Sequence, residues 1–237
     1  MISPNDKFED IREYYNNDYY ENISSDLALP WHCKKIGERL QEMNEKSVLD
    51  VACGTGEWLG YFKKRGAQIA GIDLSQRAIE ECQKRFPDGE FVCGPAEVLP
   101  FEDARFDLIT CMGSLEHFLD KPKALAEMRR VAKPDAEFVI LVPNAGFLTR
   151  RLGLYKGTQQ VKAKEDVFDL ATWEKLLADS GLQVKQRWRD LHPLSCSWIM
   201  RGNALFWPIR ALQAVALATW PIAWQYQVYH YCKATEE

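Results

Sequence analysis

The sequence predicts an α/β fold, in which a mostly parallel β-sheet carries helices on both of its faces. Two observations predict it. From residue 47 to residue 146, short apolar runs alternate with segments of helical spacing, which is the rhythm of strand–helix–strand units. The first of these runs ends in a glycine-containing turn and fits a buried parallel strand. The length of 237 residues suits one domain, and 46% hydrophobic with 27% charged residues excludes a disordered chain.

Apolar runs locate the strands, and helical periodicity locates the helices. Strands are predicted at residues 47–51, 68–72, 90–93, 105–112, 137–142, 182–190 and 224–233. Helices are predicted at residues 34–43, 57–65, 76–85, 123–132 and 171–180. Ser75 is expected to cap the helix over 76–85 and Thr172 the helix over 171–180, and Pro134 is expected to stop the helix over 123–132.

Residues 1–46 are predicted to form a helical cap with a polar character, broken by Pro30. Four tyrosines stand out in it: Tyr14, Tyr15, Tyr19 and Tyr20. They either close over a ligand as a lid or pack as an ordinary helix face. His32, beside Trp31, is a weaker candidate for the substrate side and is expected to be structural.

Charge and cysteine usage exclude several classes of protein. A net charge of −4 disfavours a nucleic-acid binder, which would normally carry a basic surplus. The seven cysteines form no C-x-x-C pair, so neither a zinc knuckle nor a disulfide framework is expected, and a reducing compartment such as the cytoplasm is the simple interpretation. The N-terminal residues lack the apolar run of a secretory signal, and no His, Asp or Glu spacing predicts a metal site.

The sharpest signal is the stretch VLDVACGTG at residues 48–56. Gly54 and Gly56 let the backbone turn tightly and approach a ligand closely, and the helix that follows offers free N–H groups. A dinucleotide fold would need a third glycine at position 59, which is Leu59. Asp50, directly before the turn, instead suits a zwitterionic ligand with an ammonium group.

Four segments in this order resemble the motifs of class I S-adenosylmethionine-dependent methyltransferases. The first is DVACGTG at residues 50–56, with Ala52 in place of the first glycine of the motif, and the second is GIDLS at 71–75. The third is GPAEVLPF at 94–101, where Pro95 replaces the family's adenine-binding aspartate. The fourth runs from FDLI at 106–109 to MGSLEHF at 112–118 and is similar to small-molecule and quinone-type methyltransferases.

The resemblance implies a Rossmann-like sheet of seven strands with an antiparallel last strand, and S-adenosyl-L-methionine as cofactor. Asp50 would hold the methionine amino group, the turn would lie along the cofactor, and Asp73 would accept from the ribose hydroxyls. Glu97 or a backbone carbonyl would replace the missing adenine contact, and the Ala96 N–H would reach the adenine edge. The expected cofactor-binding residues are Asp50, Ala52, Gly54, Gly56, Asp73, Leu74, Ala96, Glu97 and Met112.

Methyl transfer requires alignment of donor and acceptor, and an oxygen acceptor must also lose a proton. His117 follows the fourth strand and titrates near neutral pH, so it is the candidate catalytic base; the alternative is that it packs behind the loop. Glu116 either orients His117 or points away. The acceptor is expected to be a small molecule, and the methylated atom stays open.

The chain is expected to be one domain: the cap at 1–46, a cofactor-binding core at 47–146, and a substrate-side half at 147–237 with an apolar insertion at about 198–224. Three interpretations of the insertion compete. It covers a lipophilic acceptor, or it forms a core or dimer helix. Alternatively, it lies on a membrane surface with Trp207, Trp220 and Trp224 at the boundary. Five basic residues follow the core, and they either contact an anionic acceptor or lipid headgroup or lie in a solvated loop. These residues are Arg150, Arg151, Lys156, Lys162 and Lys164.

Two rival functions remain. One is a non-catalytic S-adenosylmethionine binder, which would bind the cofactor without turnover. The other is a nicotinamide-dependent reductase, for which the pattern Tyr229-x-x-x-Lys233 is the only support, in a segment predicted to be a strand.

Overall fold

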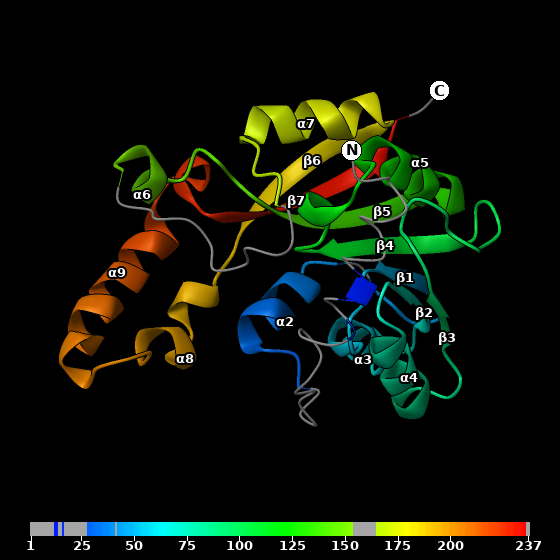
Figure 1. The fold of residues 1–237 in the computed structure, drawn as a ribbon, viewed down its shortest axis with the longest axis horizontal. Helices are drawn as coiled ribbons and strands as arrows, with labels where there is room; N and C mark the ends of the chain where they lie inside the picture. The colour runs from blue at the N-terminus through cyan, green and yellow to red at the C-terminus, as the bar shows by residue number, and fades with distance from the viewer. Residues whose placement is uncertain (1–11, 14–15, 17–27, 41, 154–164, 236–237) are drawn as a thin grey trace.

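The structure is a computed structural model and describes residues 12–13, 16, 28–40, 42–153 and 165–235. Its centre is a seven-stranded sheet in the order β3-β2-β1-β4-β5-β7-β6 (Figure 1). The strands are β1 Ser47–Val51, β2 Gln68–Asp73, β3 Glu90–Cys93, β4 Phe106–Met112, β5 Ala132–Pro143, β6 Leu182–Arg189 and β7 Gln227–Ala234. β1 to β5 pair in parallel, whereas β7 is antiparallel to both β5 and β6. The predicted fold class, including the antiparallel last strand, is confirmed.

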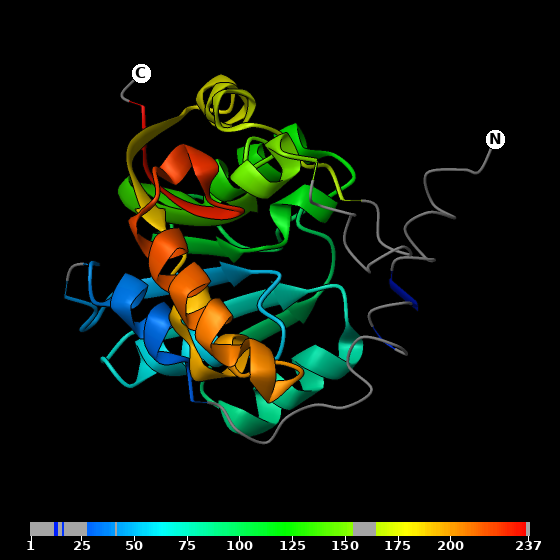
Figure 2. The same ribbon diagram turned by 90° about the vertical axis from the view of Figure 1, so that its left-hand side faces the viewer.

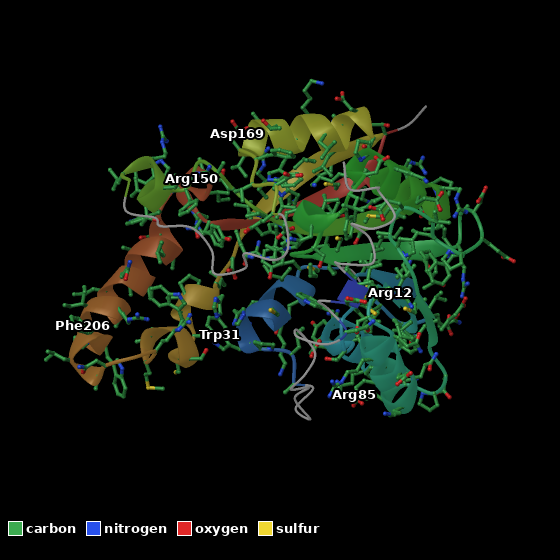
Figure 3. All side chains as sticks on the ribbon, in the orientation of Figure 1. Arg12, Trp31, Arg85, Arg150, Asp169 and Phe206 are labelled. Carbon is green, nitrogen blue, oxygen red and sulfur yellow. The ribbon has the colours of Figure 1, made fainter. Side chains whose placement is uncertain are left out.

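Helices cover both faces of the sheet. α2 Trp31–Gly37, α3 Glu57–Lys63 and α4 Gln76–Arg85 lie together, and α5 Lys121–Val131 and α7 Leu170–Asp179 lie on the other side (Figures 1 and 2). Figure 3 marks the two sides with Trp31 and Arg85 on one and Asp169, at the start of α7, on the other. Each side has its own buried cluster, so neighbours such as Val48 and Leu49 on β1 face different clusters. A strand buried on both faces is a continuous apolar run, which is why these strands were visible in the sequence.

The order of strands places a ligand site at one edge of the sheet. β1 lies between β2 and β4. The chain runs outward from β1 to β2 and β3 on one side, and then returns to β4 and continues to β5 on the other side, so the switch point lies between β1 and β4. In open α/β sheets, ligands bind outside the carboxyl ends of the strands at such a switch point. Because β7 is antiparallel to β6, the residues between them leave and re-enter the sheet at this same edge.

Those intervening residues form the predicted apolar insertion. They fold as α8 Cys196–Ile199, the single turn Ala204–Phe206, α9 Trp207–Thr219 and the single turn Ile222–Trp224. Figure 1 shows α8 and α9 projecting from the end of the molecule far from β3. A further short helix, α6 Leu148–Arg151, follows β5.

Several predicted boundaries were wrong. The cap of α7 is Asp169, whose Oδ1 accepts a hydrogen bond from the Thr172 N–H at 2.8 Å, so Thr172 is not the cap. Pro134 does not stop α5, which ends at Val131 because Ala132 already has an extended backbone and begins β5. α2 begins at Trp31 and ends at Gly37, although Leu40 and Met43 are buried as expected.

Other predictions were confirmed. Ser75 caps α4, accepting from the Ala78 N–H at 3.3 Å. The predicted last strand is present as β7, which the alternation of large and polar residues had indicated. It begins at Gln227 rather than at residue 224, because residues 222–224 form a single turn. The tyrosines at 14, 15, 19 and 20 and the lysines at 156, 162 and 164 lie outside the described residues.

Candidate functional site

The turn after β1 has the backbone conformation that its small residues predicted. Ala52, Gly54 and Gly56 all have positive φ, at 60°, 54° and 85°. Glycine takes this left-handed conformation freely, whereas Ala52 takes it at a cost of about 1 kcal/mol. The turn is therefore held in one shape by its surroundings rather than by the preference of the chain alone.

Two contacts hold the turn from the side of α4. The Cys82 thiol donates to the Gly54 carbonyl at 3.3 Å, and the Arg85 guanidinium donates to the Thr55 carbonyl at 3.0 Å. A Cβ on Gly56 would lie 3.0 Å from the Phe86 ring, which is closer than packed carbons normally approach. Gly56 is therefore needed both for its φ and for the close approach of α4.

Asp50 lies at the end of β1 with 3% of its surface exposed. The Thr110 hydroxyl, on neighbouring β4, donates to its Oδ1 at 2.6 Å. Burial raises the pKa of the Asp50 carboxyl to about 7, against the lowering effect of that hydrogen bond. A carboxyl in this state gains from a cation placed beside it, because the cation offsets the cost of burying the charge.

Asp73, at the end of β2, is tied to the same turn. Its Oδ2 accepts from the Gly54 N–H at 2.9 Å, and its Oδ1 accepts from the Ser75 N–H at 2.9 Å. Burial raises the pKa of this carboxyl, while hydrogen bonds from the Ser75, Gly54 and Leu74 backbone oppose the rise. A carboxylate has about four acceptor positions, so after these three hydrogen bonds Asp73 keeps one position for a ligand hydroxyl.

The segment after β3 carries Ala96, which is buried, and Glu97, which is half-buried. Glu97 Oε1 accepts from the backbone N–H groups of Leu119 and Asp120, at 3.0 and 3.2 Å. The side chain thus ties the loop after β3 to the loop before α5. No local pattern indicated these partners, which lie more than twenty residues away along the chain.

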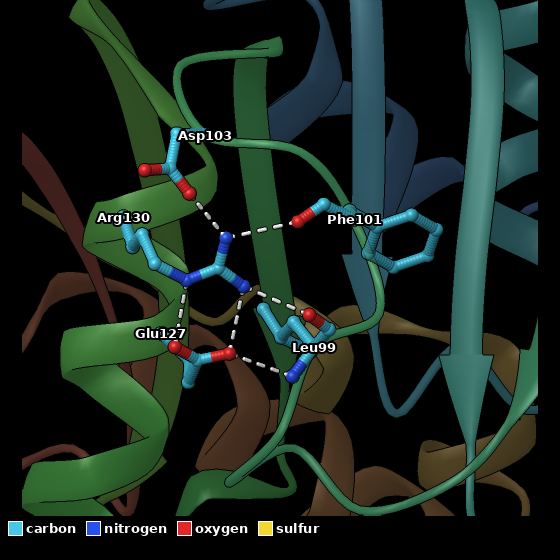
Figure 4. A network of polar contacts seen from close by, with 5 residues as sticks. All are labelled: Leu99, Phe101, Asp103, Glu127 and Arg130. Atoms are coloured by element: carbon cyan, nitrogen blue, oxygen red, sulfur yellow. Dashed lines mark hydrogen bonds and ion pairs between the residues drawn. The ribbon is translucent and has the colours of Figure 1, made fainter.

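Arg130, which sequence reasoning missed, holds residues 99–103 of the loop after β3 in place (Figure 4). From α5 its guanidinium donates to the carbonyls of Leu99 and Phe101, at 2.8 and 2.9 Å, and to the carboxylates of Glu127 and Asp103. Glu127 in turn accepts from the Leu99 N–H at 2.8 Å. The pKa of Arg130 is raised by these carboxylates, so the planar cation stays charged and holds the loop against α5.

The end of β4 carries the remaining predicted residues. Met112 and His117 are half-buried, and Gly113 turns the chain with φ 68°. His117 ends a single 3₁₀ turn, Leu115–His117, in which its N–H donates to the Ser114 carbonyl at 2.9 Å. Its neighbour Glu116 is buried. The carboxyl ends of β1, β2, β3 and β4 therefore bring all the predicted cofactor residues and His117 to one edge of the sheet.

His32, expected to be structural, lies on α2 beside the turn His192–Leu194, which follows the carboxyl end of β6. It is mostly buried on α2, with its ring 5.2 Å from that of His192, and burial lowers its pKa. Within the described ranges, no three His, Cys, Asp or Glu side chains are grouped as metal ligands would be. No helix in that part of the chain has both the length and the hydropathy to cross a membrane.

Comparison with known proteins agrees with this geometry. Residues 49–140 match the family model described as a methyltransferase domain. The resemblance to class I S-adenosylmethionine-dependent methyltransferases is therefore confirmed for the core of the chain. Among curated proteins, the demethylmenaquinone methyltransferase of Thermotoga maritima is 40% identical over 121 residues, which is 50% of this chain and 52% of that protein. The chain spans about half the length of this relative.

Solved structures share the fold over a longer range. The 1,6-didemethyltoxoflavin-N1-methyltransferase of Burkholderia thailandensis, solved with S-adenosylhomocysteine, has a TM-score of 0.66 at 17% identity and covers 100% of this chain and 92% of its own. An S-adenosylmethionine-dependent methyltransferase from Mesorhizobium loti has a TM-score of 0.65 at 15% identity. The match covers 87% of this chain and 99% of that protein's chain. At these identities the likeness concerns the fold alone.

Proposed function

We propose that the chain is an S-adenosyl-L-methionine-dependent methyltransferase that acts on a small, lipophilic acceptor. The observation that carries this proposal is the joining of two acids to one glycine turn. Asp50 ends β1 directly before the turn, and Asp73 accepts from the Gly54 N–H at 2.9 Å. The proposed arrangement is one domain: a cap at 1–46, a cofactor core at 47–146 and an acceptor side at 147–237.

The residues of the site fit this cofactor, which supplies an activated methyl group on a sulfonium. The buried Asp50 carboxyl gains from a nearby ammonium, and Asp73 has an acceptor position left for a ribose hydroxyl. A Cβ added at Gly94, in the β3 loop that carries Ala96 and Glu97, would make an ordinary van der Waals contact with the Ile72 side chain at 3.6 Å. Leu74 and Met112 would border the cofactor, and His117 would border the acceptor.

The proposed acceptor class rests on two supports. The apolar insertion rises from the same edge of the sheet as the glycine turn, which suits an acceptor with a large apolar part. The relative from Thermotoga maritima is named for demethylmenaquinone, a lipophilic quinone. We therefore extend the proposal to a reduced quinone or a similar hydroxylated ring.

The test has two steps. Calorimetry should detect binding of S-adenosylhomocysteine, and Asp73→Asn should weaken it, whereas Asp88→Asn, at an exposed position, should not. The protein should then transfer label from methyl-labelled S-adenosylmethionine to dithionite-reduced demethylmenaquinone or to a cell extract. Binding without transfer to any acceptor would favour the non-catalytic binder. Thermal stabilisation by NADH and not by S-adenosylhomocysteine would favour the reductase.

The proposal includes contact with a membrane through α9 and the turn before it, which we term the α9 surface. Its apolar side chains are unusually exposed: Leu205 by 76%, Ile209 by 62% and Leu212 by 74%. Phe206 belongs to the same surface, at the end of the molecule farthest from β3 (Figure 3). An exposed apolar patch of this kind marks an interaction site.

Charge favours an anionic lipid surface over a second copy of the chain. Residues 191–235 contain no Asp or Glu, while Arg201 precedes the apolar positions and Arg210 lies between Ile209 and Leu212. Arg150 and Arg151 lie on α6, also at the protruding end (Figure 3). An amphipathic helix with basic flanks and Trp at its boundary is typical of a helix that lies in the lipid interface. A lipophilic acceptor would then reach the site without crossing water.

Sedimentation with vesicles tests this part of the proposal. The protein should bind vesicles of phosphatidylglycerol and phosphatidylcholine more tightly than pure phosphatidylcholine, and less tightly at high salt. The double variant Leu205→Gln/Leu212→Gln should lose binding, whereas Leu119→Gln, an exposed leucine in the loop before α5, should not. A wild-type dimer by light scattering that this double variant converts to a monomer, without vesicle binding, would make the surface a dimer interface instead.

A further inference from the structure

One polar side chain at the proposed site, that of Gln227, has no role in the proposed function. Gln227 is the first residue of β7, where the chain returns to the sheet from the apolar insertion. The side chain is half-buried, its amide is not closed from solvent, and it makes no hydrogen bond within the described residues. An amide offers two donors and an acceptor oxygen, so this group is available to a ligand that enters the site.

The Gln227 amide lies at the end of β4, beside the strand that carries the glycine turn. A Cβ added at Gly113, the residue after β4, would meet Gln227 Nε2 at 3.9 Å. β4 pairs with β1, and the Thr110 hydroxyl near its end donates to Asp50 Oδ1 at 2.6 Å. The Gln227 side chain therefore reaches back from β7 across β5 to the strand next to β1.

Asp50 and Gln227 also lie on the same face of the sheet. Val48 and Tyr229 belong to one buried cluster. Each stands two residues from Asp50 or Gln227 in the same strand, and side chains at that spacing share a face. A cofactor held at Asp50 and an acceptor that contacts the Gln227 amide would therefore be neighbours on one side of the carboxyl edge.

The backbone that carries Gln227 is held in place by Asn144. The Asn144 side chain is 1% exposed and donates to the carbonyls of Ala223 and Gln225, at 2.9 and 3.0 Å. The Asn144 N–H donates to the Tyr226 carbonyl at 2.6 Å. A binding group on a fixed backbone loses little conformational freedom when a ligand arrives, which favours binding.

From this placement, we propose that Gln227 determines acceptor specificity: its Nε2 donates a hydrogen bond to the hydroxyl oxygen of an aromatic acceptor. The inference rests on the proposed function and names the polar group that the site recognises. A few polar groups among apolar side chains fix the orientation of a ligand in its pocket. The insertion supplies the apolar side chains, and the Gln227 amide supplies the contact that orients the ring toward the methyl donor.

A cycle of two proteins and two ligands isolates this contact. Gln227→Met keeps the length of the side chain and removes the amide. In equilibrium dialysis with S-adenosylhomocysteine bound, Gln227→Met should bind 2-naphthol about 3- to 10-fold more weakly than wild type, because one hydrogen bond is lost. Naphthalene, which lacks the oxygen, should bind both proteins equally.

A matched control and a kinetic measurement complete the test. Gln68→Met makes the same change at an exposed position at the amino end of β2, and should bind 2-naphthol as wild type does. All three proteins should bind S-adenosylhomocysteine equally, which verifies that each is folded. With reduced demethylmenaquinone, Gln227→Met should lower kcat/KM for the acceptor and leave KM for S-adenosylmethionine unchanged.

The outcomes separate the two proposals. Absence of S-adenosylhomocysteine binding would refute the proposed function itself. If wild type binds it but methylates no acceptor, the dialysis cycle alone decides the role of Gln227. Equal affinity of wild type and Gln227→Met for 2-naphthol, or an equal loss of affinity for 2-naphthol and naphthalene, would overturn the inference. Wild type that binds 2-naphthol no more tightly than naphthalene would overturn it as well.

Discussion

Replacing Asp50 by Asn should stabilise the ligand-free protein at neutral and alkaline pH. The Asp50 carboxyl is buried beside the glycine turn, and burial raises its pKa from 3.8 to about 7. In the unfolded chain the same carboxyl has its ordinary pKa, near 3.9. Between about pH 4 and pH 7 the folded protein therefore holds a proton that the unfolded chain has lost. Stability falls with rising pH over this window and is constant above it.

The size of the effect follows from the difference in pKa. A folded-state pKa that is higher by about three corresponds to about 4 kcal/mol of unfolding free energy lost by pH 8. The amide introduced by Asp50→Asn stays neutral, and its oxygen can still accept from the Thr110 hydroxyl, so this loss is absent. The variant should be up to about 4 kcal/mol more stable than wild type at pH 8, and this difference should shrink to about 1 kcal/mol at pH 4.5.

Urea denaturation of the two proteins at several pH values, without ligand, measures this difference. Calorimetry with S-adenosylhomocysteine should show the opposite trend, since Asp50→Asn removes the proposed partner of the ligand ammonium. In wild type the affinity should rise with pH through about 7, because the ammonium favours the ionised carboxyl. A stability difference that does not change with pH, or a variant less stable than wild type at pH 8, would refute the reasoning.

Three further predictions concern the frame of the site. Gly56→Ala should lower the free energy of unfolding by about 1–3 kcal/mol in urea melts, since the position has φ 85°; an unchanged melt would contradict the steric argument. Asp73→Asn should weaken S-adenosylhomocysteine binding by about 1–3 kcal/mol in calorimetry, because one oxygen becomes a donor that faces a backbone N–H; equal affinity would remove Asp73 from the site. Arg130→Lys should lose about 1–3 kcal/mol of stability, as an ammonium cannot replace the planar fork, whereas Arg129→Lys on the same helix should be neutral; equal loss in both would point to a general effect of charge on α5.

Much of the fold was predictable because its signals are local. The strands buried on both faces appear as continuous apolar runs, and β1, β3 and the capped helix α4 have the predicted bounds. Errors occurred where two local signals compete. Asp169 and Thr172 both have side chains that cap helices, and only the packing of α7 decides which one does. Pro134 would break a helix, but it also fits the start of a strand.

The site divides in the same way. The turn and its acids, Asp50 and Asp73, were found from spacing. The partners of Glu97 and the role of Arg130 were not, since their hydrogen bonds join residues more than twenty positions apart. The sequence left Glu116 undecided, because burial of a side chain by distant segments leaves no mark beside it in the chain.

The sequence by itself determined the alternation of strands and helices, the left-handed glycine turn and the acids that end β1 and β2. These depend on backbone sterics and on the polarity of adjacent residues, which short segments carry. Only the tertiary structure decided that the Asp50 carboxyl holds its proton to about pH 7, that Glu116 Oε2 is closed from water, and that the apolar α9 surface stays exposed. Each of these depends on which distant segments exclude solvent from a side chain, and that is fixed only when the sheet has assembled.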